Sequence, residues 1–129
     1  MRGFIAVAAA ATLGCAQHAG RTTTAARAPA AAAEPPLTVV VENHNSADVV
    51  VTMVVQGAQG RRLGTVGGNR TGTFNVPVAV LGGTRSMMLV AHAVGGRGSY
   101  ASEAVTVSGG RRAVWSLENG FTRSVLAVY

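Results

Sequence analysis

The chain has 129 residues, of which 48% are hydrophobic and 12% are charged. This composition fits one small domain and excludes a chain that is disordered throughout. The basic residues are all arginine and give a formal net charge of +6, and the single cysteine excludes an internal disulfide or a cysteine-based zinc site.

The N-terminal segment, residues 1–14, is predicted to be a lipoprotein signal peptide. Arg2 supplies a positive charge, and the uncharged run that follows ends at Leu13. Such a run is typical of an export signal and is shorter than the roughly 20 residues of a membrane-spanning helix. The sequence Thr-Leu-Gly-Cys at residues 12–15 resembles the lipobox of bacterial lipoproteins, although an aliphatic residue usually stands at the position of Thr12.

The lipobox resemblance implies cleavage before Cys15 and attachment of a diacylglycerol to its thiol. Ala16 after the cysteine implies sorting to the outer membrane rather than retention in the inner one. Acylation would also remove a lone thiol from an oxidising compartment. The alternative is an ordinary signal peptide cut after Ala16, which would leave a secreted protein without an anchor.

Residues 15–36 are predicted to form the lipidated cysteine and a disordered linker. The segment is rich in alanine, threonine and proline and holds no large apolar side chain that could build a core. A flexible coil of this length would hold the following domain a few nanometres from a membrane.

Residues 37–129 are predicted to form the folded domain, an all-β structure. β-Branched runs alternate with glycine- and asparagine-rich turns that recur every 8–12 residues, which is typical of a β-sandwich or a small barrel. The strands are expected at 37–43, 48–56, 61–66, 71–76, 85–94, 100–107, 111–118 and 121–129. Asn119-Gly120 is the strongest hairpin signal in the chain.

Alternation along these strands predicts the side chains of the core. One face of the second strand carries four apolar residues, and the seventh strand places a tryptophan between alanine and leucine. The predicted core residues are Val39, Val41, Val49, Val51, Met53, Val55, Leu63, Phe74, Leu89 and Trp115. Val50 and Val54 fall on the opposite face, where a loop or a partner surface is expected to cover them.

Several of these strands resemble the small immunoglobulin-like β-sandwich domains of uncharacterised bacterial lipoproteins. The resemblance spans Thr38 to about Asn119. It rests on residues 39–43, 49–51, 62–66 and 114–119. It implies a single antiparallel sandwich of seven to eight strands, and it carries no activity, since fold alone does not define function.

Catalytic and metal-binding patterns are not found in the sequence. The carboxylates show no paired spacing, the histidines show no ligand spacing, and the doubled glycines open no helix. We therefore predict no enzyme activity, no cofactor and no metal site. Because export would separate the chain from nucleic acid, we expect no nucleic-acid partner.

The expected function is that of a membrane-anchored envelope module that binds or supports another protein. The alternative is a binder of polysaccharide or anionic glycan. The residues that would carry glycan binding are Tyr100, beside a glycine-rich turn and expected to be exposed, and Arg97, Arg111 and Arg112.

Overall fold

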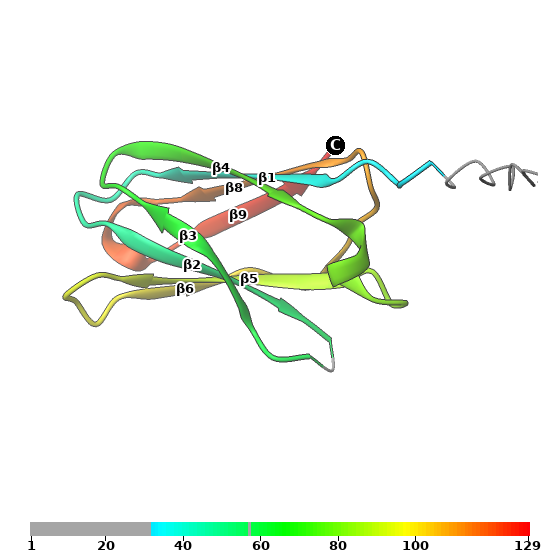
Figure 1. The fold of residues 1–129 in the computed structure, drawn as a ribbon. Coiled ribbons are helices and arrows are strands. Elements are labelled where there is room, and N and C mark those ends of the chain that lie inside the picture. Colours follow the sequence, from blue (N-terminus) through cyan, green and yellow to red (C-terminus); the bar gives the residue numbers. More distant parts are fainter. Residues whose placement is uncertain (1–31, 57) are drawn as a thin grey trace, which may run out of the picture. The chain divides into compact units, whose positions relative to one another are not determined.

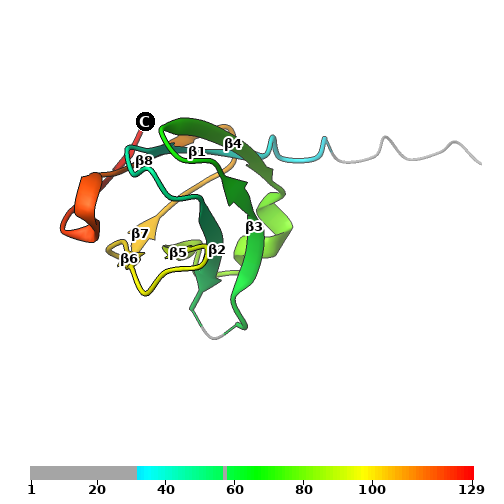
Figure 2. The ribbon, with the colours of Figure 1, turned by 90° about the vertical axis from the view of Figure 1, so that its left-hand side faces the viewer.

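A computed structural model describes residues 32–56 and 58–129, and the signal peptide, Cys15 and most of the linker lie outside this range. The described part is all-β and forms two packed sheets (Figures 1 and 2). Its strands are β1 (Leu37–Asn43), β2 (Val49–Val55), β3 (Arg61–Val66), β4 (Arg70–Val76), β5 (Ser86–Ala93), β6 (Ser99–Ala101), β7 (Val105–Thr106), β8 (Arg112–Leu117) and β9 (Ser124–Val128). Two short 3-10 helices, η1 (Val78–Leu81) and η2 (Asn119–Phe121), join β4 to β5 and β8 to β9.

The two sheets define a β-sandwich, as the sequence predicted. The four-stranded sheet has the order β4-β1-β8-β9, and the five-stranded sheet has the order β3-β2-β5-β6, with β7 also paired to β5. Every pairing is antiparallel except that of β1 with β8, which is parallel. The parallel pair brings the first and eighth strands together at the centre of one sheet, which a hairpin cannot do.

The core between the sheets is built from the faces that alternation predicted. Val39, Val41, Val49, Val51, Met53, Val55, Leu89 and Trp115 are buried. Leu63 and Phe74 are only half-buried and pack against the edge of this core, because β3 and β4 are the outermost strands of their sheets. The outward Val50 and Val54 are also half-buried.

The predicted strand 100–107 is divided in two by Ser102. The Ser102 amide donates to the Leu89 carbonyl, while its hydroxyl accepts from the Leu89 amide at 2.8 Å. A side chain thus replaces a backbone acceptor in the ladder, and the strand breaks into β6 and β7. The described domain consequently has nine strands instead of seven to eight.

β8 and β9 form the hairpin that Asn119-Gly120 predicted, but its turn is longer than the two residues left between the expected strands. The turn widens into η2, with a positive φ at Gly120 (81°) and Phe121 (57°). Glycine adopts this backbone freely, whereas a phenylalanine rarely does. The Phe121 amide donates to the Tyr100 hydroxyl at 3.1 Å, and the two rings pack 4.9 Å apart. Tertiary contacts therefore hold the unusual conformation.

The last residues of the predicted linker are tied to the domain. Glu34 forms a two-pronged ion pair with Arg85, with N–O distances of 2.6 and 2.9 Å. It also accepts from the Gly109 amide at 3.1 Å, and the Gly110 amide donates to the carbonyl of Pro35. These bonds hold the chain in a fixed position from Glu34 onward, three residues before β1 begins.

Candidate functional site

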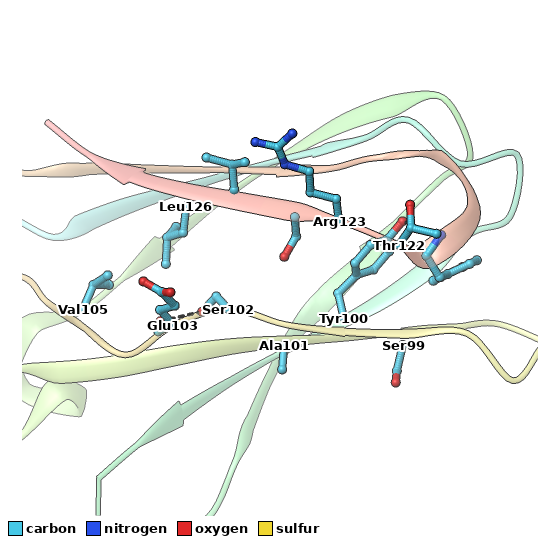
Figure 3. A pocket seen from close by; sticks show the side chains of 12 residues that line it. Ser99, Tyr100, Ala101, Ser102, Glu103, Val105, Thr122, Arg123 and Leu126 are labelled. Atoms are coloured by element: carbon cyan, nitrogen blue, oxygen red, sulfur yellow. Dashed lines mark hydrogen bonds between the residues drawn. The ribbon is translucent and has the colours of Figure 1, made fainter.

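A groove runs along β9, at the edge of the four-stranded sheet (Figure 3). It lies between β9 and the interrupted β6–β7 segment of the other sheet and encloses about 570 Å³. Leu126 points from β9 toward Glu103 and Val105 on the opposite side, whereas the Arg123 side chain points away from the groove (Figure 3). The groove exists because Ser102 breaks the facing strand, so that the two sheets are not closed along this side.

Exposed apolar side chains are concentrated on the same strand. Four large hydrophobic residues of the described chain are exposed: Val94 (53%), Val125 (48%), Val128 (37%) and Tyr129 (68%). Three of the four belong to β9 or follow it directly. Single exposed apolar residues are normal on a protein surface, but a cluster along one strand indicates a contact surface.

The outer edge of β9 presents backbone groups with no ladder partner in the described chain. Arg112 and Tyr129 exchange two hydrogen bonds, and the Glu118 amide donates to Arg123, so alternate residues of this strand face β8. The residues between them, Ser124, Leu126 and Val128, therefore direct their amides and carbonyls away from β8. This edge is available for another strand.

The structure does not bring the predicted glycan-binding residues together. Tyr100 is only 5% exposed, so the prediction that it is an exposed aromatic is wrong. Arg97 lies in the turn between β5 and β6, whereas Arg111 and Arg112 lie where β8 begins, at the opposite end of the sandwich (Figure 1). All three arginines are exposed, but Arg97 is too far from Arg111 and Arg112 to form one binding site with them.

Tyr100 is buried because it is part of a polar network that sequence reasoning missed. Its hydroxyl accepts from the side-chain amide of Asn45 at 2.7 Å and donates to the Glu118 carbonyl. Asn45 in turn accepts from the Gly120 amide at 2.9 Å, and Asn43 donates to the carbonyls of two turns. The two asparagines belong to residues 43–46, Asn-His-Asn-Ser, a composition that predicts a simple turn. No local pattern indicates that their hydrogen-bond partners lie far along the chain.

The remaining charged groups form one ion pair in the described chain. The hydrogen bond from Arg85 holds the pKa of Glu34 below its ordinary value, helped by the Gly109 amide, and the same bond raises the pKa of Arg85. Both side chains are about 40% exposed, so water screens this interaction. The pair fixes the entrance of the domain and lies at a different place from the β9 groove.

Neither a group of three or more potential metal ligands nor a helix long and apolar enough to span a bilayer occurs in residues 32–56 and 58–129. Cys15, the predicted lipidation site, lies outside the described residues.

The fold defines the described part as a two-sheet β-sandwich with one open, apolar strand edge. No family model matches the chain, and no curated protein matches it.

Proposed function

We propose that this protein is a non-enzymatic, lipid-anchored module of the bacterial envelope that binds another protein. The observation that carries the proposal is the open edge of β9, where backbone groups without a partner among the described residues lie together with the exposed Val125, Val128 and Tyr129. Addition of a strand to such an edge supplies main-chain hydrogen bonds, and the alternating apolar side chains supply specificity.

The anchoring part of the proposal rests on the sequence of the N-terminal segment. A charged start, a short apolar run and the lipobox-like residues before Cys15 favour export and acylation. Two or more acyl chains give a stable anchor, whereas one gives only reversible attachment. The linker would then present the sandwich at a short distance from the membrane, toward the outer membrane if Ala16 acts as a sorting residue.

The non-enzymatic part is supported by how the buried polar side chains are used. Asn43, Asn45 and Ser102 are buried, and each hydrogen-bonds to backbone groups of the protein itself. These bonds hold turns and strand ends in place. The glycan-binding alternative is not carried further, because Tyr100, its proposed platform, is enclosed in the same network.

Two measurements test the proposal. The first is mass spectrometry of the mature full-length protein from a bacterial envelope, where we expect a chain that begins at an acylated Cys15. A chain that begins at Gln17 without lipid would reject the anchor. The second is crosslinking in cells with a photoreactive residue in place of Val125.

The crosslinking experiment has a matched control at Thr73. Thr73 is exposed and lies on β4, the opposite edge strand of the same sheet. We expect adducts with a protein from position 125 and several-fold fewer from position 73. Equal yields at both positions, or no protein adduct at 125, would reject β9 as the contact surface.

A further inference from the structure

The four outer edges of the sandwich differ in how they are protected from further strand pairing. β3 begins with Arg61 and Arg62, and its pairing with β2 contains an irregularity. Charged residues and bulges are the usual means of blocking a sheet edge. Ser102 interrupts the β6–β7 edge, so no continuous strand is presented there.

The β4 edge is protected by contact with β3. A Cβ atom added at Gly64 of β3 would lie 2.6 Å from the ring of Phe74 on β4, so this ring sits directly against the glycine. The two edge strands therefore lie side by side and close the sandwich on that flank (Figure 2). Arg70 starts β4 and Pro77 follows it, which limits the strand at both ends.

β9 has none of these protections in the described chain. Its residues, Ser-Val-Leu-Ala-Val, contain no charge, no proline and no glycine. The outward amides and carbonyls of Ser124, Leu126 and Val128 form an uninterrupted series along the edge. An uncharged, regular edge strand is the kind of element that pairs with another strand.

We propose that the occupant of this edge is β9 of a second copy of the same chain, paired antiparallel about Leu126. This inference rests on the proposed function and specifies its partner. A two-fold axis at Leu126 pairs each outward-directed residue with another one: Leu126 with itself, and Ser124 with Val128 of the second copy. Each such pair exchanges two hydrogen bonds, so the backbone pattern of the strand is complementary to itself.

The side chains are compatible with the same register. Val125 would face Ala127 of the second copy, which places apolar side chains opposite each other. Arg123 would face Tyr129 of the second copy, where a guanidinium can stack on the aromatic ring. The two copies of Arg123 stand at opposite ends of the paired segment, so the positive charge of the chain does not oppose this contact.

The membrane anchor strengthens the argument for pairing between copies. A strand of this length buries little surface, and its hydrogen bonds replace bonds to water, so pairing in dilute solution is expected to be weak. Two chains tethered to one membrane have a high effective concentration, which favours a weak symmetric contact. The test therefore uses full-length protein in the envelope.

The register can be tested with two variants that each add one cysteine, Val125→Cys and Ala127→Cys, carried on differently tagged full-length chains that are expressed together. These positions form a close cross-strand pair in the proposed register, within the distance that a disulfide spans. Two copies of Val125→Cys alone are diagonal neighbours, about 7–8 Å apart, and are expected to crosslink poorly. After mild oxidation we expect at least about tenfold more mixed disulfide than either variant gives with itself.

The control is the pair Thr73→Cys and Asn75→Cys, which has the same two-residue spacing on β4 and is at least as exposed as Val125 and Ala127. The wild-type chain, with Cys15 alone, controls for the native thiol.

Ser124→Pro removes one outward amide at the first residue of β9, where proline is tolerated. With an unchanged circular-dichroism spectrum, this variant is expected to reduce the mixed disulfide severalfold.

The outcomes separate this inference from the proposed function. Mixed disulfide no greater than in the β4 control, or unaffected by Ser124→Pro, would overturn pairing between copies. Photo-crosslinking from position 125 to a different protein without self-crosslinking would also overturn it, while leaving the proposed protein-binding function in place. An unlipidated N-terminus would reject the anchor without affecting the measured register.

Discussion

The hydroxyl of Tyr100 accepts a 2.7 Å hydrogen bond from the side chain of Asn45, across 55 residues of sequence. The bond joins the loop after β1 to the edge strand β6. The same hydroxyl donates to the carbonyl of Glu118, so it also holds the turn that leads into β9. One side chain thus ties two loops to β6 at one end of the sandwich and fixes the turn from which the open edge strand begins.

Replacement of Tyr100 by phenylalanine is expected to destabilise the domain by about 1–3 kcal/mol, because the Asn45 and Phe121 donors lose their acceptor in a buried site. Chemical denaturation followed by tryptophan fluorescence measures this change. Tyr129→Phe is the control, since Tyr129 is 68% exposed and its loss is expected to change stability by less than about 0.5 kcal/mol. Equal effects of the two variants would contradict the structural role of the network.

Trp115 provides a second test of the core. It is fully buried, and its indole nitrogen has no hydrogen-bond partner in the described chain. Trp115→Phe therefore leaves no polar group unpaired and is expected to be milder than Trp115→Ala, which opens a cavity and should lower the free energy of unfolding by about 3–5 kcal/mol. Circular dichroism during denaturation gives both values. A phenylalanine variant as unstable as the alanine variant would indicate that the indole nitrogen has a partner.

A third prediction concerns Gly68, in the turn between β3 and β4. A Cβ atom there would lie 2.1 Å from the carbonyl oxygen of Ser46, and backbone atoms cannot move aside cheaply. We expect Gly68→Ala to reduce stability by about 1–3 kcal/mol through this overlap. Gly83→Ala is the matched control, because nothing lies within 4 Å of its added Cβ atom. Thermal unfolding of both variants is the measurement, and similar melting temperatures would refute the close approach.

The ion pair between Glu34 and Arg85 predicts a small pH dependence of stability. Arg85 holds the pKa of Glu34 below the ordinary value of 4.5, so the folded state favours the charged carboxylate. The resulting stabilisation is present above the unfolded-state pKa and is lost as the pH falls through the lower folded-state value. Glu34→Gln is therefore expected to flatten the decline in stability below pH 4.5, measured by denaturation across acidic pH. An unchanged acid profile would indicate that the pair does not persist in solution.

The all-β class, nearly all strand positions and most of the core were predictable from the pattern of residues along the chain. Val49, Val51 and Met53 alternate with residues of the opposite face, and this period of two fixes which side chains a sheet can bury. Glycine-rich turns separate the strands because they permit sharp changes in chain direction. Information of this kind is local and can be read without knowing which strands are neighbours.

The burial of Tyr100, the interruption at Ser102 and the open edge at β9 were not predictable in this way. Each depends on contacts between distant segments: Tyr100 with Asn45, Ser102 with Leu89, and β9 with no strand beyond it in the described chain. The pattern of residues 124–128 predicts a strand but does not state whether that strand is central or at an edge. Strand order arises from long-range packing, and it decides which backbone groups are left for a partner.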